Sequence, residues 1–378
     1  MWKRARWWGV PILMMTLSGC AALPAHSVSA STAPRSAVYP LDSRWLLLRA
    51  KVERIRPTHR LTQLPATYLI NQVTSQGILF TIFPTFGMPM HGWKNGLYMV
   101  SPKSAKILAF VPVPLAWSVS SAALGGDWMV YALQGESRRL GFRIAATNWV
   151  RKSRDLLWQV PLNQRLLSPI TDLVVLGHTA YWVANLATHR GVVSRLFAAN
   201  LTTRRVSVVW QEYPKETGLM CFSMTSTPTG LWLSVGDLNR TRGPSGSLWF
   251  WSIPRHQVTT RIPLWHAPLF LYGATPEGPI FSANVSDTAN GPARIGSYPM
   301  YLANIRTHRL DQLTTPVNPG NLVTVDGATI AVAGMGISSE LVNLRTASVS
   351  VLPVPDSEIG GGWLVEHLAH TMLWSPLP

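Results

Sequence analysis

The sequence predicts an all-β protein built from seven repeated units, and three observations carry this prediction. The apolar runs are short, rich in Val, Leu, Ile and Trp, and bounded by turn residues, as in β-strands. No amphipathic stretch of helical length interrupts them. A self-similar pattern also recurs, in which an apolar strand runs into a basic turn and a second short strand follows. Such a period is typical of repeat architectures, whose units bury their cores against one another.

The repeat also gives the order of strands within a unit. The basic turns begin at Ile55, Val100, Val150, Leu201, Ile253, Ile305 and Leu344. Each interval holds a first strand, a turn, a second strand, a loop of variable length and a third strand, and the basic turn leads to a fourth. Four antiparallel strands recurring at this period form one blade of a propeller. We therefore predict a seven-bladed β-propeller of four-stranded blades.

The two ends of the domain predict how the ring closes. The segment 44–65 offers only a third and a fourth strand, and the segment 363–378 offers only a first and a second. In the latter, His370-Thr371 aligns with His178-Thr179 of an internal unit. We expect these N- and C-terminal half-blades to pair as one blade, because a closed ring leaves no open strand edge.

The repeats resemble those of seven-bladed propellers of the YVTN and quinoprotein-like kind, in which a short polar turn precedes a strand of the type V-x-x-I-P. The segment "GSLWFWSIPRHQVTTRIPL", residues 246–264, matches best. The chain departs from other propeller families, since it has no WD dipeptide, no double glycine in each unit and no sialidase box. The resemblance therefore implies an architecture and no particular activity.

The N-terminus resembles the signal peptide of bacterial lipoproteins. Three basic residues precede an apolar stretch over 7–17, which is too short to cross a bilayer as a helix, since that takes about 20 residues. It runs into Leu-Ser-Gly-Cys at 17–20, like a lipobox. The resemblance implies cleavage after Gly19 and a diacylglycerol on the Cys20 thiol. The alternative is an ordinary signal peptide followed by a coincidental cysteine.

This resemblance predicts the domain organisation and the location. Residues 1–19 are the signal peptide, residues 20–40 the lipidated cysteine and a flexible tether rich in Ala, Ser and Pro, and residues 41–378 the propeller. The tether spans roughly 25 Å if it behaves as a random coil. We expect an extracytoplasmic protein that is anchored to a bacterial membrane through the lipid on Cys20.

Cysteine and tryptophan usage predict how the domain is held together. The other cysteine, Cys221, lies in the strand-like "LMCFSM" and is expected in the core. An aromatic residue recurs on the predicted second strands, at Phe80, Trp128, Trp182, Trp232, Phe281 and Trp374. We expect these rings to pack between blades rather than to form a carbohydrate-stacking surface. Trp93, Trp149 and Trp251 lie nearer to loops or turns, where an exposed anchor is conceivable.

Positive charge is the most pronounced feature of the composition. The chain has 33 Lys and Arg against 17 Asp and Glu, and loss of residues 1–19 leaves 30 basic residues and a formal charge of +13. One set of basic residues lies in the turns between third and fourth strands: Arg56, Arg60, Lys103, Lys106, Arg151, Lys152, Arg154, Arg204, Arg205, Arg255, Arg306, Arg309 and Arg345. The candidate binding loops between second and third strands carry a second set: Lys94, Arg138, Arg139, Arg190, Arg240, Arg242 and Arg294.

In a propeller these two sets project from opposite faces. Either set would attract anionic lipid or an anionic wall polymer, and the alternative is a solvated positive surface suited to an unusual environment. Nucleic acid fits the charge equally well, but the export signal makes it an unexpected partner.

The search for chemistry gives few candidates. The sequence has no phosphate-binding loop, no G-x-S-x-G and no H-E-x-x-H. The catalytic residues, if the protein is an enzyme, are therefore unknown, and we predict no cofactor and no metal. His367 and His370 fall on opposite faces of a strand, which argues against joint ligation. Asp172 and Glu366 lie on or before first strands, which line the channel, so they are the candidate channel carboxylates. Their alternative role is hydrogen bonding to neighbouring strands.

Three functions agree with these features. The preferred one is a non-catalytic binding or scaffold module that holds an envelope protein or an anionic cell-wall polymer at the face bearing the variable loops. The second is an extracytoplasmic hydrolase or lyase with its site at the channel mouth. The third is an adhesin that binds by charge alone.

Overall fold

The structure is a computed structural model. It describes residues 41–42, 49–52, 56–65, 68–83, 90–136, 141–161, 163–168, 170, 172–237, 246–264, 268–283, 300–313, 323–333, 339–352 and 356–377. The predicted signal peptide, Cys20 and the tether lie outside these residues. Their boundaries remain predictions.

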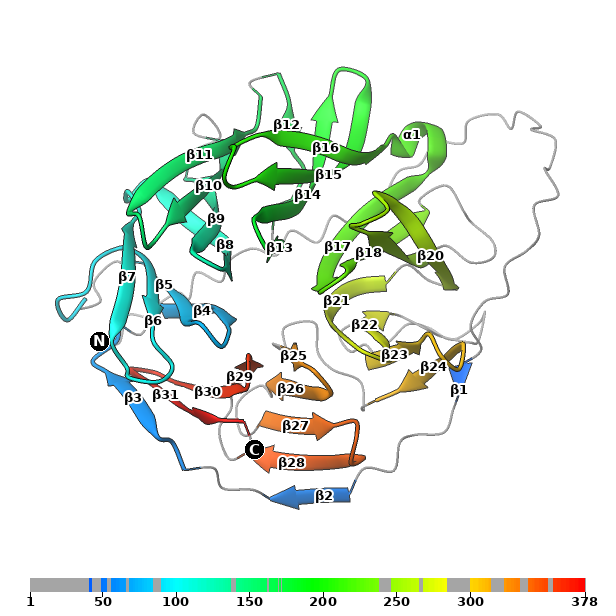
Figure 1. Cartoon of the computed structure of the whole chain (residues 1–378). Coiled ribbons are helices and arrows are strands. Elements are labelled where there is room, and N and C mark those ends of the chain that lie inside the picture. The colour runs from blue at the N-terminus through cyan, green and yellow to red at the C-terminus, as the bar shows by residue number, and fades with distance from the viewer. Residues whose placement is uncertain are drawn as a thin grey trace, which may run out of the picture. The chain divides into compact units, whose positions relative to one another are not determined.

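Seven sheets are arranged in a ring, which confirms the predicted seven-bladed β-propeller (Figure 1). Blade 1 contains β4 (Tyr68–Val73), β5 (Ile78–Ile82), β6 (Gly96–Val100) and β7 (Ile107–Pro112). Blade 2 contains β8 (Trp117–Gly125), β9 (Trp128–Gly135), β10 (Phe142–Asn148) and β11 (Ser153–Gln159). Blade 3 contains β12 (Arg165–Leu166), β13 (Leu173–Leu176), β14 (Thr179–Thr188), β15 (Gly191–Asn200) and β16 (Val206–Glu212).

The next three blades repeat this order of neighbouring antiparallel strands. Blade 4 contains β17 (Leu219–Thr227), β18 (Gly230–Asp237), β19 (Gly246–Ser252) and β20 (Gln257–Leu264). Blade 5 contains β21 (Pro268–Thr275), β22 (Gly278–Ala283), β23 (Met300–Asn304) and β24 (Arg309–Gln312). Blade 6 contains β25 (Val323–Asp326), β26 (Thr329–Ala333), β27 (Ser339–Asn343) and β28 (Ser348–Leu352).

Blade 7 joins the two ends of the chain, but the division of strands differs from the prediction. The C-terminal part supplies three strands, β29 (Ser357–Gly360), β30 (Trp363–Leu368) and β31 (Thr371–Pro376), and the N-terminal part supplies only the outer strand β3 (His59–Thr62). Thr371 therefore begins a third strand, whereas Thr179 begins a second one. The alignment of these two positions was wrong by one strand, because all the strands are short and apolar and follow similar turns.

The two remaining strands also differ from the prediction. The segment expected to form a third strand instead contains β2 (Arg49–Val52), and β1 (Leu41–Asp42) lies just before that segment; they pair in parallel with β28 and β24, respectively. They add a fifth, outermost strand to blades 5 and 6, and Figure 1 shows β2 along the rim beside β28. The strand before Ile55 is thus not the partner of β3, so six of the seven predicted basic turns join a third to a fourth strand.

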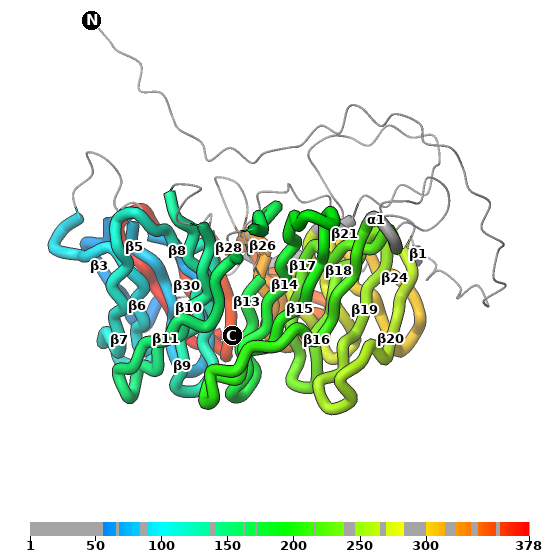
Figure 2. Tube along the Cα trace, turned by 90° about the horizontal axis from the view of Figure 1, so that it is seen from above, coloured from blue at the N-terminus to red at the C-terminus, as the bar shows by residue number. Residues whose placement is uncertain are grey.

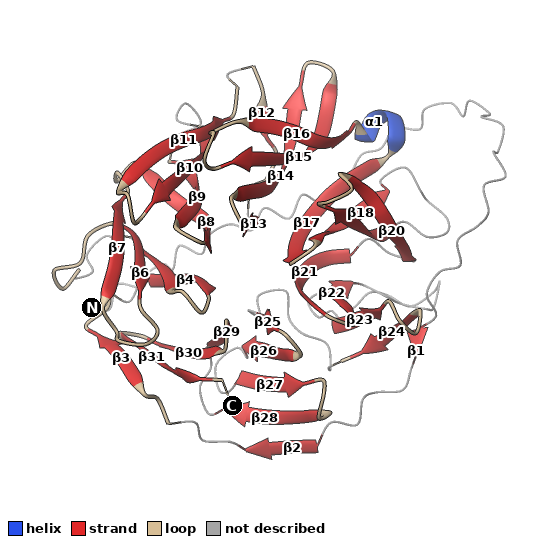
Figure 3. Ribbon diagram, in the orientation of Figure 1, coloured by secondary structure: helices blue, strands red, loops and turns tan. Residues whose placement is uncertain are grey.

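Almost all of the described chain is strand, turn or loop (Figure 3). The helix among these residues is the single turn α1 (Pro214–Thr217), which connects blades 3 and 4. In the part of the chain that the structure describes, no helix has the length and apolar character needed to cross a membrane.

The six basic turns share one backbone geometry, which explains their similar sequences. A residue one or two positions before the fourth strand has a positive φ in every case, at Ala105, Lys152, Arg204, His256, His308 and Ala347. Asn or Ser ends the third strand in five of these blades and Ser101 directly follows it in blade 1, and the side-chain oxygen of this residue commonly accepts hydrogen bonds from the turn. Asn304 Oδ1, for example, accepts from the backbone N–H groups of Arg306 and Thr307 at 3.1 and 3.0 Å. Such Asx turns satisfy backbone donors that the strands leave unpaired.

Aromatic side chains fill the core between blades, as predicted. The rings of Trp182, Phe80, Phe281 and Trp374 are inaccessible or nearly so, and Trp128 and Trp232 are buried as well. Trp374 lies on the third strand of its blade rather than on the second. Cys221 is also fully buried, as expected for a core residue.

The innermost strands are tied to one another by side chains. Gln72 Oε1 in blade 1 accepts a hydrogen bond of 2.6 Å from the backbone N–H of Leu124 in blade 2. Thr324 Oγ1 in blade 6 accepts one of 2.9 Å from the N–H of Ile359 in blade 7. The ring is therefore held around the channel by polar contacts as well as by the core between the sheets.

Candidate functional site

The strand order gives the propeller two faces of different composition. The first–second turns and the third–fourth turns lie on one face, which we call the hairpin face. The second–third loops and the connections between blades, including α1, lie on the other, which we call the loop face. In Figure 2 the loop face, marked by α1, is the upper edge of the ring and the hairpin face is the lower edge.

The hairpin face carries a ring of cations. The described basic residues of its third–fourth turns and the adjoining strand starts are all exposed: Lys103, Lys106, Arg151, Lys152, Arg154, Arg204, Arg205, Arg255, Arg306, Arg309 and Arg345. None of the six turns contains Asp or Glu. Arg204 pairs with Asp155 of the neighbouring blade at 3.0 Å. Among the further carboxylates of this face, Asp127 and Glu277 lie in first–second turns and Asp326 ends the first strand β25.

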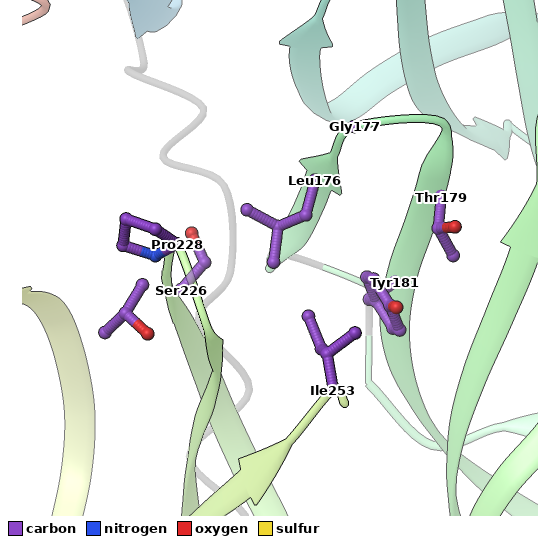
Figure 4. A pocket seen from close by; sticks show the side chains of 8 residues that line it. Leu176, Gly177, Thr179, Tyr181, Ser226, Pro228 and Ile253 are labelled. Carbon is purple, nitrogen blue, oxygen red and sulfur yellow. The ribbon is translucent and has the colours of Figure 1, made fainter. Parts of the chain in front are cut away.

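Grooves open between blades on the hairpin face, and two of them matter here. The larger of the two, of about 1240 Å³, is lined by Arg255, Trp232 and Phe250 of blade 4, by Ile305 of blade 5 and by Asp326 of blade 6. The smaller, of about 610 Å³, lies between blades 3 and 4, where Figure 4 shows Leu176, Tyr181 and Ile253 around it. The turn Thr227-Pro228 separates the two grooves.

The predicted binding loops lie on the loop face where the structure describes them. Lys94 and Arg190 are both exposed there. The other five predicted positions, Arg138, Arg139, Arg240, Arg242 and Arg294, lie outside the described residues, as does Cys20. Lys94 and Arg190 come from blades 1 and 3.

The two predicted channel carboxylates are not brought together. Asp172 Oδ2 accepts a hydrogen bond of 3.0 Å from the backbone N–H of Met224, so it ties blade 3 to blade 4. Glu366 lies on β30, the second strand of blade 7, so its predicted place on a first strand was wrong, because β29 precedes it as the innermost strand. Its side chain is buried opposite Ser357, and burial raises the pKa of its carboxyl group. The arrangement assigns Asp172 the hydrogen-bonding role that was the alternative to catalysis.

A cluster of titratable groups that was not predicted from the sequence lies at the loop-face end of the seam between blades 7 and 1. The rings of Tyr68 and His367 have centroids 4.0 Å apart, and the Tyr68 hydroxyl lies 2.9 Å from the carbonyl oxygens of Leu368 and Thr371. Glu358 is buried in β29, and Asp356 is exposed just before that strand. The alternation "DSE" ahead of an innermost strand is the sequence signal that points to these carboxyl groups.

The environment of this cluster disfavours charge. Burial raises the pKa of Glu358 to about 8, and the Asp356 carboxylate adds to this shift. Burial lowers the pKa of His367, while Asp356 acts in the opposite direction, and burial also raises the pKa of Tyr68. Such perturbed groups occur both at functional sites and in structural networks.

The loop face also exposes large apolar side chains. Leu69, Phe222 and Phe270 lie on innermost strands, and Leu368 ends a second strand. Phe83, Leu115 and Leu167 lie in the adjoining loops. Because first strands begin and second strands end at the loop face, these residues lie around or near one mouth of the channel. Phe222 is the residue left out of register where β17 shifts against β18.

Trp93, Trp149 and Trp251, for which an exposed anchoring role was conceivable, are not exposed. Trp251 is buried, and Trp93 and Trp149 are partly buried against the cores of blades 1 and 2. The indole N–H of Trp93 donates to the carbonyl of Gln63 at 3.0 Å, and that of Trp149 donates to Gly126 at 3.2 Å. These rings therefore hold turns in place.

His367 and His370 were expected on opposite faces of one strand, but His370 lies in the turn after β30, and the two side chains have separate contacts. His367 packs on Tyr68, whereas His370 Nδ1 donates to the carbonyl of Leu64 at 2.9 Å. Within the described ranges, no three His, Cys, Asp or Glu side chains come together in a way that could hold a metal ion.

Comparison with known proteins shows the fold and no family. No family model matches the chain, and no curated protein matches it. Among solved structures, the oligogalacturonate lyase of Vibrio parahaemolyticus is similar with a TM-score of 0.52 and 9% identity, over 85% of this chain and 92% of that one. An oligogalacturonate lyase in complex with manganese gives 0.53 and 11%, over 84% and 93%. At such identities the likeness establishes the propeller architecture alone.

Proposed function

We propose that the protein is a lipid-anchored extracytoplasmic propeller that binds an envelope protein or an anionic cell-wall polymer without catalysing a reaction. The anchor is the lipid on Cys20, and the tether 21–40 lets the domain reorient above the membrane. The exposed apolar residues of the loop face are the observation that carries this proposal.

These residues favour a protein as the partner. Phe222 and Phe270 are 40% and 41% exposed on the innermost strands of adjacent blades. Aromatic residues are enriched in protein interfaces, and apolar surface that several elements present together marks interaction sites. Lys94 and Arg190 on the same face would steer an acidic partner by charge.

The test is a pull-down from envelope extract with the chain from residue 20, compared with a Phe222→Asp/Phe270→Asp variant. One defined species should be retained at high salt by the original chain and lost from the variant. A Val208→Asp variant is the control, because Val208 is exposed on an outer strand. The proposal would be contradicted if the original chain captured only material that high salt removes, and if both variants captured the same material. That result would favour the adhesin.

A second candidate, a hydrolase or lyase acting near the channel mouth, is favoured by the cluster of Tyr68, Asp356, Glu358 and His367. A carboxylic acid that stays protonated at neutral pH is suited to general acid catalysis. Release of soluble product from envelope polymers, abolished by Glu358→Gln in a folded protein, would establish this activity. If no envelope fraction were turned over, the enzyme candidate would be contradicted and the binding role would stand.

A further inference from the structure

We propose that the hairpin face is a membrane-docking surface that binds anionic phospholipid headgroups. This inference deepens the proposed function, since it rests on the domain being held near a membrane by the Cys20 lipid. It also assigns the two faces different roles, with the hairpin face toward the bilayer and the loop face toward the partner.

The distribution of charge fits a plane better than a linear polymer. Exposed Lys or Arg residues stand on the third–fourth turns of six blades, so the cations encircle the ring instead of following one strip. Charges this close to an anionic surface are attracted within a Debye length, about 10 Å at 0.1 M salt. A bilayer contacts all six turns at once, whereas a single polymer strand would contact only a few of them.

Apolar side chains accompany these cations. Val150, at the tip of the blade 2 turn, is 54% exposed, and Ile305 is 38% exposed at the tip of the blade 5 turn. Ile107 and Leu108 are exposed where β7 leaves the blade 1 turn. A basic surface with protruding apolar residues is the combination that binds the interface of an anionic bilayer.

The groove between blades 4 and 5 combines both kinds of contact. Arg255 of blade 4 and Ile305 of blade 5 line it, together with Asp326 of blade 6, and it opens on the hairpin face. A cation suits the phosphate of a lipid headgroup, and the isoleucine suits the start of its acyl chains.

The start of the described chain agrees with this orientation. β1 runs parallel to β24, with Leu41 opposite Leu310 and Asp42 opposite Asp311. Since β24 leaves its turn at the hairpin face, β1 also runs from the hairpin face toward the loop face. The described chain therefore begins at the end of β1 nearer the hairpin face, where Leu41 follows the last residue of the predicted tether.

The experiment uses the chain from residue 20 with Cys20→Ser, so that no lipid is attached, and measures co-sedimentation with vesicles. Binding is expected to vesicles containing phosphatidylglycerol and not to pure phosphatidylcholine. A triple variant Arg255→Gln/Arg306→Gln/Arg345→Gln should weaken the partition at least tenfold, given about fivefold for each charge near the surface. The fold should survive, because the backbone amides of Arg306 and Arg345, not their side chains, bind the capping Asn residues.

The matched control removes three exposed cations from the loop face: Lys94→Gln/Arg165→Gln/Arg190→Gln. This variant should keep its partition within about twofold, apart from the long-range effect of net charge. A second pair separates the apolar contribution, since Val150→Ser should reduce binding severalfold and Val208→Ser, at a 44% exposed position on β16, should not.

Three results would overturn the proposal. They are absence of binding to anionic vesicles, an equal loss in both triple variants, and binding of soluble polyphosphate that depends on the hairpin cations when vesicle binding does not. The anchor is tested separately by the mass of the N-terminal peptide of the exported protein. A missing acyl group would refute the lipid anchor. The vesicle experiment would still show whether the hairpin face binds anionic lipid.

Discussion

The ring of His59 stacks on the indole of Trp374, with centroids 5.8 Å apart and planes 9° apart. The two residues are opposite each other in the β3–β31 pairing that closes the propeller. The indole N–H of Trp374 also donates to the carbonyl of Pro102 in blade 1 at 2.7 Å. One side chain near the C-terminus thus contacts both the N-terminal strand of its own blade and the adjacent blade.

Replacing this tryptophan should weaken the closure of the ring. Trp374→Ala is expected to lower the free energy of unfolding by about 3–5 kcal/mol, since a large buried ring is lost and the Pro102 carbonyl loses its donor. His59→Ala should cost roughly 1 kcal/mol, because stacking adds only modestly to burial. Urea denaturation measures both, and a loss below 1 kcal/mol for Trp374→Ala would show that the seam does not depend on it.

The side-chain hydrogen bonds between the innermost strands of adjacent blades lead to a second prediction. Asp172→Ala should destabilise the protein by about 1–3 kcal/mol, because the buried N–H of Met224 loses its acceptor. Gln72→Ala is the matched variant, since it removes the equivalent tie to Leu124. Similar losses of thermal stability in the two variants would indicate a structural role for both. A stable Asp172→Ala protein would reopen the question of a chemical role for this carboxylate.

The left-handed residue that the six basic turns share leads to a third prediction. His308 has a φ of 57°, a conformation that costs non-glycine residues about 1–2 kcal/mol and β-branched residues more. His308→Gly should therefore be neutral or slightly stabilising, and His308→Val should lower the melting temperature. Thr307→Val, one residue earlier in the same turn, is the control. If the two valine variants melted at the same temperature, the left-handed position would not be limiting in this turn.

The sequence was sufficient to predict the ring of blades but not the strands that close it in blade 7. The six basic turns could be located because Asn or Ser, a basic residue and a left-handed position recur at each one, as at Asn200 and Arg204. The closure of the ring between β3 and β31 has no recurring sequence pattern of this kind. β3 follows a segment that pairs in parallel elsewhere, and the parallel partners of β1 and β2 lie hundreds of residues away. Glu358 was overlooked for a related reason, since only assignment of "SEIG" to an innermost strand places its carboxyl group in the core.

The buried thiol makes a fourth prediction. Cys221 is inaccessible, its Sγ lies 3.6 Å from the carbonyl oxygen of Ser223, and burial raises the pKa of the thiol far above its ordinary value. Because the thiolate is the reactive form, a Cys20→Ser chain should give no reaction with a thiol reagent until it unfolds. Denaturant should then release one thiol per chain. Rapid labelling of the native protein would show that β17 opens locally.

Glu358 makes the last prediction, which concerns pH. Its folded pKa of about 8 lies above the ordinary value of 4.5, so the folded state holds a proton that the unfolded state has lost between these values. The contribution of Glu358 to stability is thus fully present below about pH 4.5 and is lost as the pH rises through 8. Burial of Glu366 acts in the same direction, and the lowered pKa of His367 acts in the opposite one, by destabilising the fold below its ordinary pKa.

Comparison with Glu358→Gln isolates the term that belongs to this residue. The variant keeps a neutral side chain of the same shape, so its free energy of unfolding should fall less than that of the original protein between pH 5 and pH 8. The difference should reach a few kcal/mol at pH 8, since one pKa unit corresponds to about 1.4 kcal/mol. Urea denaturation at several pH values measures it. Parallel curves for the two proteins would mean that the Glu358 carboxylate is already ionised and compensated in the folded seam.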